Sequence, residues 1–163
     1  VYKGPGNSRI VWEEPILVHH IRIEGDPNGG TIIDGDRQHF LFFVSRCGNP
    51  GGASLQLVEF EKITFMGAEF SHEFPYSNDK IGADFAGGSV FYARDACTIS
   101  FVDCIFENNN SGNLPPPTVG SHNQFRGILH ANQSTINLTR VTFRNNSIDQ
   151  NGGSGLMFVN NGN

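Results

Sequence analysis

The feature that most constrains this chain is an eight-residue apolar pattern that occurs four times. In each copy two pairs of alternating apolar residues flank two residues that break the alternation. The copies span residues 16–23, 58–65, 99–106 and 136–143, and they start 42, 41 and 37 residues apart. The period is two, slips by one residue and then resumes, as two short strands joined by a tight bend require. A helix needs a period of 3.6, so the pattern excludes an all-helical fold.

A further short apolar stretch precedes each later copy, at residues 40–44, 87–92 and 126–130, and one at 152–159 has no copy after it. Three strands per repeat favour a parallel β-helix over a propeller, whose four-stranded blades carry Gly-His and Trp-Asp marks that are missing here. The sequence therefore predicts an all-β, right-handed parallel β-helix with about four coils of three short strands. We expect one domain over residues 1–163, as a segment of a longer chain, with residues 1–35 as an N-terminal capping coil and 107–125 as a long loop.

Stacked coils place equivalent residues above one another, so the four copies predict the core. One internal row is Ile23, Phe65, Phe106 and Phe143. The other is Ile21, Ile63, Cys104 and Val141.

Two glycine-led motifs alternate with two phenylalanine-led motifs. Gly-Gly-Ser-Val at 87–90 precedes Phe-Glu-Asn-Asn at 106–109, and Arg-Gly-Ile-Leu at 126–129 precedes Phe-Arg-Asn-Asn at 143–146. This alternation resembles the GGA[ILV] and FxxN repeats of the chlamydial polymorphic membrane protein family. The resemblance implies right-handed β-helix coils of a large surface or secreted protein and assigns no activity. The second copy departs from it, because Met-Gly-Ala follows Phe65 without an Asn.

The same motifs have a physical explanation without the family. An Asn three residues after the Phe can turn inward and hydrogen-bond backbone groups of the bend that would otherwise be buried unpaired, so Asn109 and Asn146 are expected to stack. The following glycines allow a positive φ and close packing as the chain re-enters the coil. The predicted structural bend residues are Asn109, Asn146, Gly87, Gly88 and Gly127.

Four N-glycosylation sequons occur, at Asn109, Asn132, Asn137 and Asn145. Asn137 lies between two inward-facing residues, Ile136 and Leu138, and is therefore expected to point outward. Asn132 falls in an accessible bend, whereas Asn109 and Asn145 compete with the structural bend.

Enzymes of the pectate lyase kind would need clustered Asp with Ca²⁺ and a basic residue, or paired carboxylates. The possible members are Asp34, Asp36, Asp84, Asp95, Asp103, Asp149, Arg94 and Arg140. Asp103 and Arg140 share one bend position with Lys62, which favours a solvated charge ladder. Asp34 and Asp36 flank a glycine, which is more typical of an Asx turn than of a calcium site.

No metal or cofactor site is expected from the remaining ligand-type residues. The six histidines show no metal-ligand spacing and are expected in exposed bends: His19, His20, His39, His72, His122 and His130. The three cysteines are too few and too widely spaced for a zinc site: Cys47, Cys97 and Cys104. They are expected as buried small side chains, with one disulfide as the alternative.

Charge and hydropathy exclude two classes of partner. The net charge is −5 and the 11 Lys and Arg are scattered, so nucleic acid is not expected as a partner. No apolar stretch reaches 18 residues, so this segment is not expected to insert into a membrane.

The expected function follows from regular repeats without a catalytic constellation. We expect a non-catalytic, extracellular or cell-surface solenoid that is structural or adhesive, glycosylated and part of a larger assembly. Its expected partners are further coils of the same chain or other protein subunits, with carbohydrate as an additional partner. The alternative is a carbohydrate-active enzyme, a pectate-lyase-like polysaccharide lyase or a hydrolase.

Overall fold

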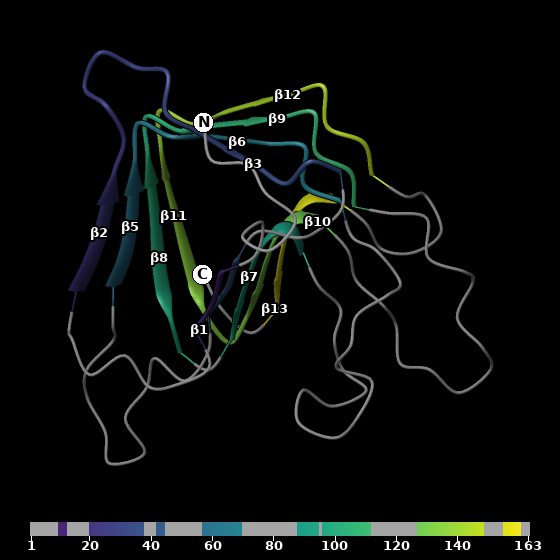
Figure 1. The fold of residues 1–163 in the computed structure, drawn as a ribbon. Coiled ribbons are helices and arrows are strands. Elements are labelled where there is room, and N and C mark those ends of the chain that lie inside the picture. The colour runs from purple at the N-terminus through teal and green to yellow at the C-terminus, as the bar shows by residue number, and fades with distance from the viewer. Residues whose placement is uncertain are drawn as a thin grey trace.

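Strands make up all the regular structure that is described. The computed structural model describes residues 10–12, 20–37, 42–44, 57–69, 88–94, 96–111, 127–148 and 155–160. The strands are β1 (Ile10–Trp12), β2 (His20–Glu24), β3 (Ile32–Asp34), β4 (Phe42–Val44), β5 (Leu57–Glu61), β6 (Thr64–Met66), β7 (Gly88–Arg94), β8 (Thr98–Val102), β9 (Ile105–Glu107), β10 (Gly127–Asn132), β11 (Thr135–Thr139), β12 (Thr142–Arg144) and β13 (Gly155–Asn160) (Figure 1). Within the described residues, no helix has the length and hydropathy that crossing a membrane requires.

The strands form three sheets, named A, B and C here. Sheet A has the order β3-β6-β9-β12, sheet B the order β1-β4-β7-β10-β13, and sheet C the order β2-β5-β8-β11. Every pairing within them is parallel. Consecutive strands enter sheets B, C and A in turn, so β1–β3, β4–β6, β7–β9 and β10–β12 are four repeats, followed by β13 (Figure 1). The predicted all-β fold with parallel strands is confirmed for the described residues.

The three sheets share one apolar core. Phe60 of sheet C contacts Phe65 of sheet A and Phe91 of sheet B edge-on, with ring centroids 5.5 and 5.7 Å apart. Along sheet A, Phe106 stacks on Phe65 at 5.1 Å and on Phe143 at 4.9 Å. Aromatic pairs of these geometries are favourable beyond the apolar area that they bury. Stacking between repeats and edge contacts between sheets therefore hold the same interior together.

The predicted position of Ile23 in the core is wrong. Ile23 lies on β2, opposite Phe60 of sheet C, and not in the row of Phe65. The partner of Phe65 in the first repeat is Ile33 on β3. Both isoleucines are partly buried against the core, so Ile23 keeps its apolar role but joins another sheet.

The predicted position of Ile21 is also wrong. Ile21 pairs with Val58 on β5, and the position equivalent to Ile63 belongs to Thr31. The backbone N–H of Thr64 donates to the carbonyl of Thr31 at 3.0 Å. The same bond recurs in later repeats, from Ile105 to Ile63 and from Thr142 to Cys104. Ile63 and Cys104 are buried, and Val141 is half-buried in the same row.

A five-residue turn in the first repeat explains both corrections. The later repeats pass from sheet C to sheet A through one residue of positive φ: Lys62 (56°), Asp103 (52°) and Arg140 (51°). In the first repeat Gly25 makes the equivalent backbone bond, to Glu61, and residues 26–30 follow before Thr31. Asp26 closes this turn by accepting from the N–H of Asn28 at 2.8 Å. The five inserted residues shift the start of β3 along the sequence. The eight-residue pattern therefore selected Ile21 and Ile23 of β2 for rows that belong to Thr31 and Ile33.

Gly25 is required at the start of this turn because of a close approach. A Cβ at this position would overlap the backbone carbonyl of Lys62 in the next repeat. Any larger residue would therefore push the first two repeats apart.

Parts of the predicted domain organisation fall outside the described residues. The capping coil at 1–35 is described only for 10–12 and 20–35, and the loop at 107–125 only for 107–111.

Candidate functional site

The ends of β6, β9 and β12 meet at one corner of the three repeats. Each of these strands is followed by one residue of positive φ: Gly67 (60°), Asn108 (54°) and Asn145 (53°). Glycine and asparagine are the residues that adopt this conformation at least cost. The chain then continues in parallel register, with single bridges from Asn110 to Glu69 and to Ser147.

Asn109 uses its amide to join the second, third and fourth repeats. Its side chain is 1% exposed. Its Oδ1 accepts from the backbone N–H of Ala68 at 2.9 Å. Its Nδ2 donates to the carbonyl of Phe65 and to Oδ1 of Asn146, each at 3.0 Å. Backbone groups of the preceding bend, buried from water, thus receive partners from the next repeat.

Asn146 repeats this arrangement one repeat later. Its Oδ1 accepts from the backbone N–H of Asn109 at 3.0 Å, and its Nδ2 donates to the carbonyl of Phe106 at 2.9 Å. We call Asn109 and Asn146 the asparagine ladder. The equivalent residue of the second repeat is Ala68, as the departure after Phe65 in the sequence predicts.

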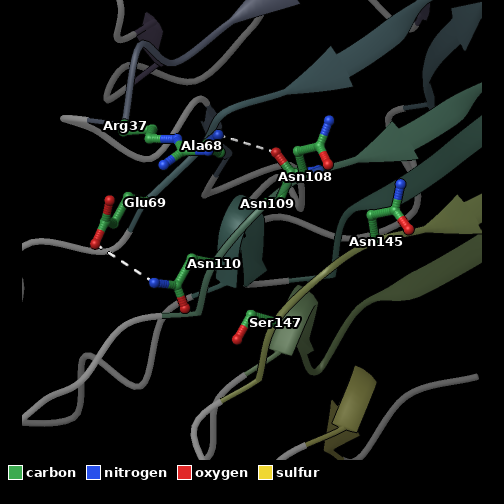
Figure 2. Close-up of a pocket in the computed structure, with 8 residues that line it drawn as sticks. All are labelled: Arg37, Ala68, Glu69, Asn108, Asn109, Asn110, Asn145 and Ser147. Carbon is green, nitrogen blue, oxygen red and sulfur yellow. Dashed lines mark hydrogen bonds between the residues drawn. The ribbon is translucent and has the colours of Figure 1, made fainter.

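A polar cavity of about 220 Å³ lies beside the ladder. It is lined by Arg37, Ala68, Glu69, Asn108, Asn109, Asn110, Asn145 and Ser147. Figure 2 shows Asn109 turned toward Ala68 and Asn110 turned toward Glu69, with Nδ2 of Asn110 3.4 Å from Oε1 of Glu69. Its amide, guanidinium, carboxylate and hydroxyl groups offer hydrogen bonds to a polar ligand.

Sequence reasoning missed Arg37 and Glu69 in this cavity. Arg37 follows β3, where its N–H donates to the carbonyl of Gly67 at 2.7 Å, and Glu69 lies two residues after that glycine. Neither residue belongs to a motif. Only the register between the first and second repeats brings them together. The apolar pattern does not predict that register, because it takes no account of the five-residue turn.

The acidic residues proposed for an enzyme do not converge where they are described. Asp34 is buried, and its Oδ1 accepts from the N–H of Asp36 at 2.9 Å, which is the expected Asx turn after β3. Asp103 lies in the bend between sheets C and A, at a different corner. The described residues hold no group of three or more His, Cys, Asp or Glu that could bind a metal ion. Asp84, Asp95, Asp149 and the side chain of Arg94 lie outside the description.

Asp103 is instead one half of an ion pair between the third and fourth repeats. Nε and Nη2 of Arg140 donate to its two carboxylate oxygens at 2.6 and 2.8 Å. This hydrogen bonding lowers the pKa of Asp103 and raises the pKa of Arg140. Lys62, at the same bend position, forms its ion pairs with Glu24 at 3.1 Å and Glu61 at 2.9 Å.

The outward face of sheet C carries a second group of charges. Nε of Arg22 lies 3.3 Å from Glu59, and its Nη2 also pairs with Glu61. Hydrogen bonds from Lys62 and then from Arg22 lower the pKa of Glu61. These pairs are at the surface, where water screens the charges and each pair contributes little to stability. They support strand pairing and do not form an acid–base pair.

The cysteines have two different states. Cys97 is disulfide-bonded, whereas Cys104 is a free thiol that is fully buried. Burial raises the pKa of Cys104, whose Sγ lies 3.3 and 3.4 Å from the carbonyls of Val102 and Phe60. The expectation of a buried small side chain thus fits Cys104, and the disulfide alternative fits Cys97. Cys47 lies outside the described residues.

One histidine departs from its expected place. His130 is in β10, not in a bend, and it is 3% exposed. It lies opposite Tyr92 and Phe158 in sheet B. Alternation along a strand could have placed it, but the sequence does not show what covers the outer face of this sheet. His19, His39, His72, His122 and the side chain of His20 lie outside the description.

The prediction of Gly88 and Gly127 as bend residues with a positive φ is wrong, because each begins a strand and neither has a positive φ. Gly127 is buried at the start of β10 and lies in register with Gly88 of β7 and Gly155 of β13. Gly87 lies outside the described residues. Gly155 was missed as a member of this row, although it ends the glycine-rich run at 152–155.

The sequons have different surroundings. Asn109 is buried, Asn132 is half-buried, and Asn137 and Asn145 are exposed.

The chain matches no protein-family model, no curated protein and no solved structure.

Proposed function

We propose that this chain is part of a right-handed parallel β-helix that serves as a non-catalytic, extracellular or cell-surface solenoid with a structural or adhesive role. The observation that carries the proposal is the asparagine ladder. The buried amide of Asn109 is bonded to both neighbouring repeats, so its polar atoms serve cohesion between repeats. The phenylalanine rows support the same reading, because they stack from one repeat to the next.

Right-handed winding is supported by a general rule for parallel strands. Each sheet gains its next strand after the chain has passed through the other two sheets. Crossover connections between parallel strands of one sheet are right-handed in about 98% of cases. The likeness to the chlamydial polymorphic membrane protein repeats points the same way.

An extracellular location is supported by the disulfide at Cys97. Disulfides form and persist in secreted and surface proteins and are rare in a reducing cytosol. Glycosylation at the exposed sequons is part of the same proposal.

Participation in a larger assembly is supported by exposed apolar residues of the last described strands. Leu138, Leu156 and Met157 are 38%, 41% and 44% exposed. Met157 is in register with Leu129, which is fully buried one repeat earlier. Further coils or another protein subunit would cover these side chains as the fourth repeat covers the third. Carbohydrate is the proposed additional partner, for the amide-lined cavity.

The test separates this function from the carbohydrate-active enzyme. The purified chain is assayed with calcium against a panel of acidic and neutral polysaccharides, and its mass in solution is measured over a range of concentrations. We expect no turnover. We also expect self-association, or binding to a natural partner, and we expect that association to weaken when Leu138 is replaced by Thr. Turnover that is lost on Asp103→Asn or Asp34→Asn would overturn the structural role.

A further inference from the structure

We propose that Asn137 carries an N-linked glycan and that Asn109, which also begins a sequon, does not. The inference rests on the proposed extracellular function, since the modification occurs in a secretory pathway. All four sequons fit the Asn-X-Ser/Thr motif, but their asparagines differ in burial. The folded structure distinguishes them.

Asn137 presents its amide to solvent. It lies in β11 between Ile136 and Leu138. Ile136 is 9% exposed and belongs to the core, and Leu138 lies on the same inward side, opposite Phe101. Because side chains alternate along a strand, Asn137 faces outward. It is exposed, and no hydrogen bond involves its side chain among the described residues. A glycan at this position would therefore not disturb the core.

The hydroxyl that completes this sequon is equally accessible. Thr139 is exposed and lies two residues further along β11, so it is on the same outward face as Asn137. The neighbouring strand presents Ser100, which is buried, and Val102, which is half-buried, at the paired positions. Neither of these is a charged group that would compete for the amide.

A glycan on Asn109 is incompatible with the folded protein, because both hydrogens of its amide are in use. In the modification, Nδ2 attacks the anomeric carbon of an oligosaccharide activated as a glycosyl pyrophosphate. The new N–C bond forms as the C–O bond breaks, the electron pair of that bond leaves with the pyrophosphate, and Nδ2 gives one proton to a base of the glycosyltransferase. At Asn109 that proton is one of the two donated to Phe65 and Asn146 at 3.0 Å. A sugar there would occupy the place of a neighbouring repeat.

The glycan on Asn137 is compatible with the proposed assembly. Its side chain leaves sheet C on the outward face, roughly perpendicular to the direction in which strands add to the sheet. The backbone edge of β11 therefore stays accessible to a further strand, and the glycan would mark the side of the solenoid and not its end.

The test is site-specific mass spectrometry of the full chain secreted from a eukaryotic cell. The protein is purified in its folded form and deglycosylated by a glycoamidase in ¹⁸O-labelled water, which converts each formerly glycosylated Asn to labelled Asp. We expect label at Asn137 and none at Asn109. Label at Asn109, or secreted folded protein without label at Asn137, would overturn the assignment.

Two substitutions that spare both asparagines serve as a matched pair. Thr139→Ala removes the sequon of Asn137 and is expected to remove one glycan from the intact mass. Ser111→Ala removes the sequon of Asn109 and is expected to leave the glycan number unchanged. Fractionation of the natural source tests the location separately: a secreted chain that lacks this glycan contradicts the site alone, whereas a cytosolic chain contradicts the proposed function as well.

Discussion

The third and fourth repeats contain equivalent residues in very different surroundings. Phe101 and Phe106 of the third repeat are fully buried. Their partners in register, Leu138 and Phe143, are 38% exposed and half-buried. The difference comes from the neighbours, because the third repeat lies between two others, whereas β11 and β12 are the last described strands of sheets C and A. In a stacked fold, burial is thus set by the adjacent repeat as much as by the residue itself.

The largest expected effect tests this comparison directly in the core. Phe106→Ala is expected to reduce the free energy of unfolding by about 3–5 kcal/mol, because it removes a ring stacked on both sides and leaves a cavity. Phe143→Ala, which removes a half-buried ring stacked on Phe106, is expected to cost about 1–2 kcal/mol. Denaturant unfolding followed by circular dichroism measures both. Equal losses would show that the fourth repeat is as well covered as the third.

The second effect compares the two members of the asparagine ladder. Asn109→Ala leaves the N–H of Ala68 and the carbonyl of Phe65 without this buried amide, at an expected cost of about 2–3 kcal/mol. Asn146→Ala removes similar bonds from Asn109 and Phe106, but Asn146 is half-buried and water can replace its amide. We expect a cost of about 1 kcal/mol there. A larger loss at Asn146 than at Asn109 would contradict the ladder as described.

These two residues also show how much of the site the sequence could predict. The spacing of each Asn from the preceding Phe is local, so its inward turn follows from short-range geometry. Arg37 and Glu69 reach the same corner only through the register between repeats. That register depends on the five-residue turn at 26–30, which no apolar period detects, because the chain offers isoleucines on both sides of the turn.

The same limit applies to the fold: local patterns predict the strands, but not what surrounds each sheet. Alternation with a one-residue slip predicts the strands of sheets C and A and their parallel pairing in the later repeats. It cannot predict what lies on the outside of a sheet, since a strand buried on both faces and a strand buried on one face share the same inward residues. His130 is the example: its neighbours Leu129 and Ala131 are inward-facing core residues, but its own burial depends on whatever covers sheet B.

A third prediction uses thiol chemistry to sharpen the comparison of repeats. Cys104 is fully buried and its pKa is raised by burial, so it should react with a thiol reagent only when the third repeat opens. Val141 holds the equivalent place in the fourth repeat and is half-buried. In a Cys104→Ser background, Val141→Cys is expected to react at least about tenfold faster than Cys104 does in the natural chain, since a tenfold ratio needs only about 1.4 kcal/mol of difference in opening.

The control for that measurement is the denatured, unreduced chain. Among the described residues Cys97 is disulfide-bonded and Cys104 is a free thiol, so Cys104 should become fully reactive once the fold is lost. Similar rates for the two positions in the folded state would mean that the third and fourth repeats open together.

The smallest expected effect concerns the ion pair that joins the two repeats. Because hydrogen bonds from Arg140 lower the pKa of Asp103 below its ordinary value of 3.8, the folded protein holds the carboxylate more strongly than the unfolded chain does. The pair therefore stabilises the fold fully at pH values above 3.8 and loses this contribution as the pH falls through the lowered folded pKa. Arg140→Gln should lower the melting temperature slightly at neutral pH and not at all in strong acid. Both groups are exposed to solvent, so about 1 M salt, in which the Debye length is roughly 3 Å, should remove most of the difference. A difference that persists in acid would mean that Arg140 acts through its packing and not through its charge.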